Sequence, residues 1–588
     1  MRRLATCAAL LWVPVLLGAG ATFATPRADV TDLFDPAALR RNICTGASDA
    51  QTKNNYVQLA SLAPPQPRQS APVPLLKGYG ALTYPISTKN PQSQAYFDQG
   101  LRLMYAFNYG AAVDSFREAQ RLDPACAMCL WGESIALGPN INFEMSGRAH
   151  LQALIAIAGA NKIIDQTTPK ERALIEAAKQ RYSADAKLTR AQLDASYAEA
   201  MKKVHETYPG DADIAAWFAE AAMDSVRPWW TSGGRVPNGL MADAIPALEA
   251  ALHARPDHPG AIHFYLHIME GSAWMEAAAP YADRLAALMP AAGHMVHMPS
   301  HLYFPLGRYK DALNANLAAI KADEDYFAGV DSFDVNYFAL FAHNLHFGLQ
   351  SASMAGDGKT SLALAAKLSG LLAPDLLRAK LALQRNAAAV TLAQVRFASP
   401  DAVLALPEPD RDFTFLVAVW HYARGAAFAA KGDTEQASAE LKTLAAFRDS
   451  MDIRVLGSVT KSIPKILEVA ELVLDARIKA GQGKWDDAVA PLTRAVTAED
   501  ELGWTGDPPW WDVPLRQSLG IAQFKAGKYR DAADSLRKAL IQAPNDGAAL
   551  AALRDTSAAL GDKVAAAAYG RLFKNAWFGP KPPDLNRL

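Results

Sequence analysis

One spacing of small and apolar residues occurs near both ends of this 588-residue chain. The earlier copy is Gly100, Ala112, Phe116, Ala119 and Pro124, and the later copy is Gly520, Ala532, Leu536, Ala539 and Pro544. A glycine on one helix lets a second helix approach, the alanines and the larger apolar residue fill the groove between them, and proline ends the unit. The spacing therefore predicts a repeated helical hairpin. Frequent alanine and sparse β-branched residues favour the same fold.

A short motif that joins a turn to the start of the second helix recurs along the chain. It reads GRYKDA at 307–312, KGDTEQA at 431–437, GKWDDA at 483–488 and GKYRDA at 527–532. These units resemble the 34-residue tetratricopeptide repeat (TPR). A wider resemblance to a family of exported bacterial TPR proteins is carried by CAMCLWG, RPWW, HFYLHIMEGS, HMVHMPSH, HNLHF and PPWWDVPLRQSLG. The resemblance implies an all-α, TPR-type solenoid, a right-handed superhelix whose concave groove binds a peptide or protein.

The helical pattern is interrupted at two places, and these interruptions divide the chain into segments. Residues 25–90 show no helical period and carry a proline-rich stretch, so we expect an extended segment there. The helical pattern runs over 91–395 and again over 416–588. Between them, 396–415 contains three prolines and two acidic clusters, and we expect it to connect two lobes.

The first segment, residues 1–24, has the three parts of a secretory signal peptide. Two arginines are followed by an apolar run from Ala8 to Leu17 and by small residues that allow cleavage after Ala21 or Ala24. We therefore expect a periplasmic or secreted protein. No later stretch is apolar enough to span a membrane once the signal is removed.

The charge balance limits the partners. Lysine plus arginine total 59 and aspartate plus glutamate total 60, a net charge of −1. Proteins that bind nucleic acid normally show a clear basic excess, so this balance argues against that class.

Histidines gather in the middle units, where seven of the twelve fall between residues 263 and 346. These seven are His263, His267, His294, His297, His301, His343 and His346. Residues four apart share one face of a helix, and His297 and His301 follow the pair His263 and His267 by 34 residues, one repeat. Imidazoles from two such neighbouring helices are expected to converge.

The convergence predicts a metal site. Glu270 lies three residues after His267 and is expected to join it, with His294, His343 and His346 forming an outer part. Histidine with glutamate suits zinc, iron or copper, and nearby methionines keep zinc and copper both open. Two other interpretations remain: a histidine lining for another ligand, and ordinary structural histidines. Pro299 within the second pair predicts a kinked or later-starting helix.

Cysteines and groove residues complete the candidates. Cys126 and Cys129 open a helix without a βαβ context, so we expect a structural disulfide or two small buried residues rather than a redox pair. A bond from Cys44 to either is an open alternative. The ligand-groove candidates are Asn140, Asn142, Asp224, Arg227 and Trp229. Of these, Asp224 and Arg227 could orient a histidine, and the RPWW cluster could equally brace a loop.

Three functions follow from these features. The first is a non-enzymatic scaffold that binds a peptide or protein and holds a metal in a histidine-rich pocket. The second is a copper or zinc storage or delivery protein. The third is a metal-dependent hydrolase with Glu270 as general base, which we disfavour because no nucleophile elbow, phosphate loop or HExxH motif is present.

Overall fold

The computed structural model describes residues 73–330, 334–379, 383–459, 462–503 and 507–585. The predicted signal peptide, Cys44 and the proline-rich stretch lie outside these residues. Residues 73–90 form neither helix nor strand.

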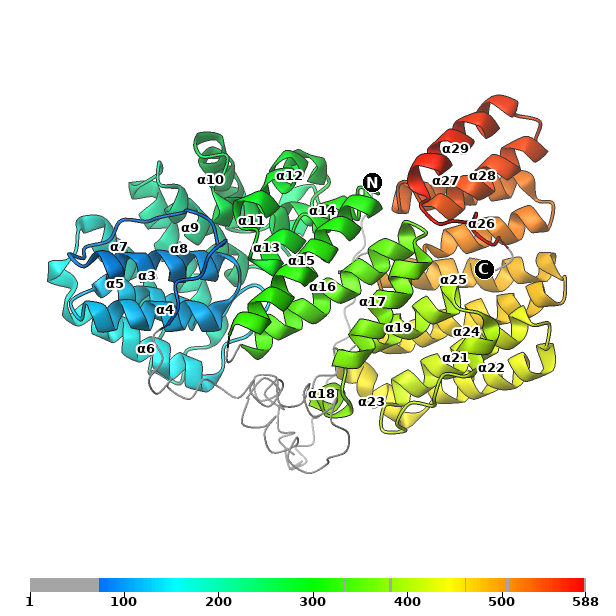
Figure 1. The fold of residues 1–588 in the computed structure, drawn as a ribbon, viewed down its shortest axis with the longest axis horizontal. Coiled ribbons are helices and arrows are strands. Elements are labelled where there is room, and N and C mark those ends of the chain that lie inside the picture. Colours follow the sequence, from blue (N-terminus) through cyan, green and yellow to red (C-terminus); the bar gives the residue numbers. More distant parts are fainter. Residues whose placement is uncertain (1–72, 331–333, 380–382, 460–461, 504–506, 586–588) are drawn as a thin grey trace, which may run out of the picture.

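Helices follow one another along the whole described chain (Figure 1), which confirms the all-α repeat fold. The first half contains α3 (Pro91–Tyr105), α4 (Tyr109–Leu122), α5 (Ala127–Ala136), α6 (Gly147–Lys162), the 3₁₀ turn η2 (Ile164–Gln166), α7 (Pro169–Lys179), α8 (Arg190–Thr207), α9 (Ala212–Ser225), α10 (Met241–Ala254), α11 (Pro259–Glu270), the 3₁₀ turn η3 (Met275–Ala278), α12 (Ala279–Leu288), α13 (Gly293–His297), α14 (Ser300–Tyr303) and α15 (Tyr309–Gly329). Two short strands, β1 (Trp230–Thr231) and β2 (Val236–Pro237), pair antiparallel between α9 and α10.

The second half continues in the same way. It contains α16 (Val335–Met354), α17 (Gly358–Leu371), α18 (Pro374–Ala379), α19 (Leu383–Phe397), α20 (Pro400–Leu404), α21 (Thr414–Ala430), α22 (Thr434–Arg448), α23 (Met451–Val459), α24 (Ser462–Gly481), α25 (Trp485–Leu502), α26 (Leu515–Lys525), α27 (Tyr529–Gln542), α28 (Gly547–Ala559) and α29 (Lys563–Ala576).

The hairpins form for the reason that the spacing predicts. A Cβ added to Gly100 would overlap the ring of Phe116, and one added to Gly520 would overlap Leu536, so each glycine lets its two helices approach. Seven of the turns also share one geometry. The residue before the second helix's N-cap is left-handed, and in all of these but the first it is glycine, which adopts that conformation without steric cost.

Two hydrophobic clusters form the core. The first is made mainly by residues from Tyr79 to Ala355, and the second by residues from Leu313 to Leu553. The change from one cluster to the other lies along α15 to α17. The segment 396–415, which we expect to connect two lobes, contributes Val403 and Phe413 to the second cluster.

The C-terminal hairpins pack back onto the middle of the chain. The side-chain amide of Asn545 donates to the Gly307 carbonyl at 3.3 Å. The backbone N–H of Phe578 donates to the Ala355 carbonyl at 2.8 Å. Loops between the late helices therefore lie close to the hairpins that carry the histidines.

None of the helices in the described part of the chain combines the length and the apolarity that crossing a bilayer requires.

Candidate metal centre

Three histidines from α11 and α13 form a first group. His263 and His267 lie one turn apart on α11, and His294 lies near the start of α13. The Nε2 atom of His263 lies 3.1 Å from that of His267 and 3.1 Å from that of His294. All three residues are buried. We call them the first triad.

The tautomer of His263 follows from its surroundings. Its Nδ1 lies 2.6 Å from the Tyr105 carbonyl oxygen, which only accepts hydrogen bonds, so Nδ1 carries the proton and donates. Its Nε2 therefore presents a lone pair to the two neighbouring nitrogens. A single lone pair accepts one hydrogen bond well, whereas a cation placed among the three nitrogens satisfies all of them.

Three further histidines repeat this arrangement and form the second triad. His297 ends α13, His301 lies on α14 and His343 lies on α16. The Nε2 of His297 lies 2.8 Å from that of His301 and 3.1 Å from that of His343.

Asn316 sets the tautomer of His297. Its amide nitrogen donates to the Ala312 carbonyl at 2.7 Å, which leaves its oxygen to accept from His297 Nδ1, also at 2.7 Å. The Nε2 of His297 is therefore unprotonated as well.

Two carboxylates flank the second triad. The Oε2 atom of Glu270 lies 3.1 Å from His301 Nδ1, and the Oδ1 atom of Asp507 lies 3.5 Å from that atom and 3.4 Å from His343 Nε2. Burial acts to lower the pKa of His301, but Asp507 and Glu270 more than offset it and raise that pKa to about 9. Without an ion, a proton on His301 Nε2 donates to His297. An ion bound to His301 Nε2 would have to displace this proton.

Burial keeps the other histidines neutral. It lowers the pKa of His263 to about 3 and that of His343 to about 4. The pKa values of His267, His294 and His297 are well below 6.5, chiefly for the same reason. Neutral imidazole is the form that binds metals.

The spacing of the nitrogens matches metal ligation. Zinc–nitrogen bonds of about 2.0–2.1 Å place two ligand nitrogens about 2.9–3.4 Å apart for octahedral or tetrahedral angles. In each triad two of the three separations are 2.8–3.1 Å, and all three ligand nitrogens lie within 4.8 Å of one another. The donor set and these distances therefore fit a transition-metal ion.

Pro299 divides the helix that the sequence predicts through the second pair. The chain forms two short helices, α13 and α14, yet Met298 and Pro299 both keep right-handed helical dihedrals between them. His297 and His301 consequently stay on one face.

The grouping differs from the predicted one. His294 and His343, expected in an outer part, belong to the triads themselves. Glu270 contacts His301 rather than His267. His346 is buried but lies outside the metal-ligand groups found in the described part of the chain.

The predicted groove residues gather at another place. Asn140, Asn142, Asp224 and Arg227 line one pocket of about 1120 Å³. The remaining candidate, Trp229, lies 4.7 Å from the guanidinium of Arg227, measured to a ring centroid.

Two of these groove residues have partners of their own. Asp224 forms a buried ion pair with Arg181 at 2.6 Å, and Arg227 donates to the Ile141 carbonyl. These partners, rather than the imidazoles of the two triads, take their polar atoms.

The sequence interpretation missed four contributors: Tyr105, Phe107, Asn316 and Asp507. Asp507 directly precedes the PPWW motif, which marked an unusual loop, but no local signal connects that loop with the histidines.

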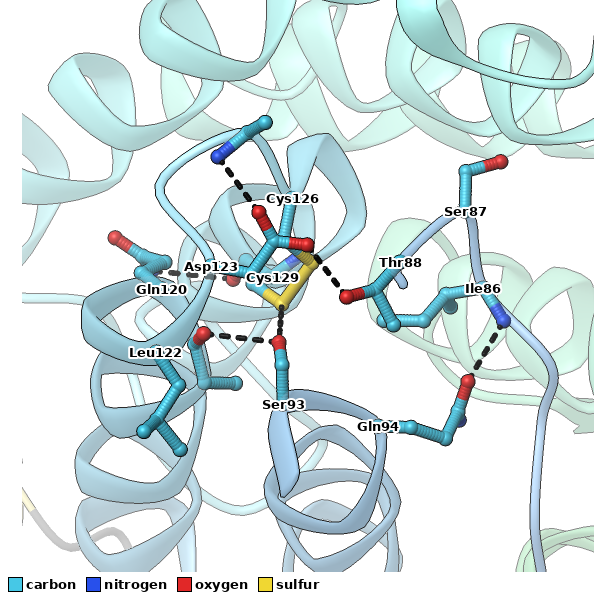
Figure 2. Close-up of a disulfide and its surroundings, with 12 residues drawn as sticks. Ile86, Ser87, Thr88, Ser93, Gln94, Gln120, Leu122, Asp123, Cys126 and Cys129 are labelled. Atoms are coloured by element: carbon cyan, nitrogen blue, oxygen red, sulfur yellow. Dashed lines mark hydrogen bonds between the residues drawn. A yellow bond between two sulfur atoms is a disulfide. The ribbon is translucent and has the colours of Figure 1, made fainter. Parts of the chain in front are cut away.

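Cys126 and Cys129 form a disulfide (Figure 2). Cys126 is the N-cap of α5, and Ser93 on α3 places its hydroxyl oxygen 3.6 Å from the Cys129 sulfur. Both cysteines are buried, so thiols in solution have little access to them. The bond thus closes the first turn of α5, and the contact with Ser93 places it against α3.

No family model and no curated protein matches this chain. Similar solved structures include the human IFIT1 dimer with m7Gppp-AAAA, at 12% identity over 93% of this chain and 99% of that chain, with a TM-score of 0.30. Another is the APC/C hetero-tetramer Cut9-Hcn1, at 11% identity over 94% and 90%, with a TM-score of 0.28. The TPR domain of P58(IPK) is 11% identical over 80% and 98%, with a TM-score of 0.21. Likenesses at these levels assign no function to this chain.

Proposed function

We propose that this chain is an exported TPR-type scaffold that binds a peptide or protein in its groove and a first-row transition-metal ion, zinc or copper, in its histidine cluster. One observation carries the metal-binding part. The Nε2 atoms of two buried residues, His267 and His294, each lie 3.1 Å from the Nε2 of buried His263, which the Tyr105 carbonyl holds unprotonated. Export rests on the signal-peptide pattern of residues 1–24.

The scaffold part rests on the hairpin repeat and on the pocket lined by Asn140, Asn142, Asp224 and Arg227. Polar and charged groups at the rim of a large concavity suit a peptide or another polar ligand.

Storage or delivery of copper or zinc is the second candidate. The carboxylates beside the second triad favour it, because the side chains of Asp507 and His343 are 45% and 21% exposed and give ions a route to solvent. Hydrolysis is less favoured, because Glu270 is engaged with His301 instead of facing an open coordination position.

Metal analysis of protein purified without an affinity tag tests the proposal. We expect bound zinc or copper and a rise in melting temperature when the same ion is added to metal-free protein. Neither bound metal nor a thermal shift with Zn²⁺ or Cu²⁺ would refute metal binding.

Two double variants locate the site. His263→Ala with His301→Ala should lose the metal. His150→Ala with His421→Ala is the matched control, because His150 contacts the Ser183 carbonyl and His421 contacts Glu440, both away from the triads. Equal metal content in the two double variants would show that His263 and His301 are not metal ligands.

A further inference from the structure

The six clustered histidines form two groups of the same design. Each triad takes two histidines four residues apart and a third from a neighbouring helix, and in each one imidazole has its Nδ1 bound to an oxygen acceptor. The groups are neighbours. The rings of His267 and His301 lie 5.6 Å apart, and those of His294 and His297 lie 5.9 Å apart, both between centroids.

A single ion does not account for this arrangement. Two nitrogens bound to one ion lie at most about 4.2 Å apart, twice the bond length. In the described part of the chain, sets of metal-ligating atoms within 4.8 Å of one another contain three residues each, and no set spans both triads. An ion held by one triad therefore leaves the nitrogens of the other triad unligated, with a single lone pair, that of His263 or His297, facing two close nitrogens.

We propose that the cluster holds two first-row transition-metal ions side by side, one in each triad. This inference rests on the proposed metal binding and adds its stoichiometry and its division between residues. Three protein nitrogens leave a coordination position open on each four-coordinate ion, so a water or a small anion completes each site.

The two sites differ in their surroundings. The first triad is enclosed by an aromatic wall, because the ring of Phe107 stacks on His294 at 4.9 Å and lies 4.4 Å from His263 and 5.8 Å from His267. The second triad faces Asp507 and Glu270. We therefore expect the second site to exchange its ion with solvent faster than the first.

Phe107, which forms this aromatic wall, has a left-handed backbone conformation that is unusual for a residue other than glycine. In the hairpin formed by α3 and α4 it has a φ of +56°. At the corresponding turn position six other hairpins carry Gly307, Gly356, Gly432, Gly483, Gly527 and Gly561, with φ between +72° and +82°. An aromatic side chain is disfavoured there, so its presence marks a requirement for the ring.

Asp507 closes the second site from a distant part of the chain. It lies in the connection between α25 and α26, more than 150 residues after His343 in the sequence. Its carboxylate nevertheless lies 3.5 Å from His301 and 3.4 Å from His343. The second ion would thereby link this late connection to the middle hairpins.

The test is the number of ions bound per chain. Metal-free full-length protein is dialysed against Cu²⁺, and separately against Zn²⁺, and the bound metal is quantified. We expect two ions in the natural protein, one in His294→Ala, one in His343→Ala, and none in the double variant. His421→Ala is the control and should keep two.

The outcomes separate the two proposals. One ion in the natural protein overturns the two-ion centre and leaves metal binding intact, whereas no ion overturns both. If a variant does not fold, electron paramagnetic resonance of the natural protein loaded with Cu²⁺ still tests whether two ions are adjacent. At two equivalents its electron paramagnetic resonance spectrum should be broadened relative to one equivalent, because neighbouring Cu²⁺ ions interact. Unbroadened spectra at both loadings would contradict adjacent sites.

Discussion

The ring of Phe107 stacks on the imidazole of His294, with centroids 4.9 Å apart and planes inclined by 20°. The contact joins the turn of the first hairpin to the start of α13. Phe107 makes this contact from a left-handed position that glycine fills in six later turns.

Replacing Phe107 with glycine tests this relationship. Relief of the left-handed strain is worth about 1–2 kcal/mol, whereas removing a buried phenyl ring costs about 3–5 kcal/mol. The free energy of unfolding, measured by urea denaturation of metal-free protein, should fall by about 1–4 kcal/mol. Metal affinity should fall at the first triad.

Phe107→Leu keeps an apolar side chain at the same strained position. We expect it to retain more stability than the glycine variant but to lose the stacking contact. If the glycine variant binds metal as tightly as the natural protein, Phe107 serves packing alone.

Gly293→Ala should disturb the first triad through sterics. Gly293 begins α13, directly before His294, and an added Cβ would overlap the buried carboxylate of Asp323. Overpacking of this kind costs about 1–3 kcal/mol. Thermal unfolding and metal content should both show the loss.

Gly370→Ala is the matched control for that variant. Gly370 lies on α17 with open space around it, so alanine should leave stability unchanged or raise it by up to about 1 kcal/mol. Similar losses in the two variants would argue against the Asp323 contact.

Asn316→Ala should lower the metal affinity of the second triad, although Asn316 is not itself a proposed ligand. Asn316 holds the Nδ1 proton of His297, and removing such a partner typically lowers metal affinity 10–100-fold. Asn316→Asp keeps an acceptor oxygen and should restore most of the affinity. Competition with a coloured chelator measures both, and equal affinity in all three proteins would exclude this role.

The raised pKa of Asp323 should make the free energy of unfolding depend on pH. Burial raises its pKa to about 7, while hydrogen bonds from Tyr337 and Asn344 act to lower it. Since this folded-state pKa lies above the unfolded value, the folded state keeps a proton that the unfolded chain has lost above about pH 4. The stabilisation is complete at low pH and disappears as the pH rises from about 4 to about 7, at up to about 1.4 kcal/mol per unit.

The variant Asp323→Asn should flatten this dependence, because asparagine does not ionise there. Urea unfolding of metal-free protein at pH 5 and pH 8 provides the comparison. The contribution assigned to Asp323 is wrong if the natural protein and the variant lose equal stability between those two pH values.

The features that could be predicted from the sequence, the helical hairpins and the histidine pairs, depend on the spacing of residues close together in the chain. The recurrence of Gly100 and Gly520 with their alanines predicted the hairpins, because residues three and four apart meet on a helix whatever the rest of the chain does. The pairing of His263 with His267, and of His297 with His301, was predictable for the same reason.

The sequence by itself thus determined an all-α repeat and brought each pair of histidines onto one face. Only the tertiary structure decided how the pairs are completed. His294 joins the first pair because α13 brings it within 3.1 Å of His263 on α11, and His343 joins the second because α16 packs against α13. Phe107 and Asp507 reach the cluster from a first turn and a late loop, since the distance between such segments depends on how successive hairpins stack, which no local spacing records.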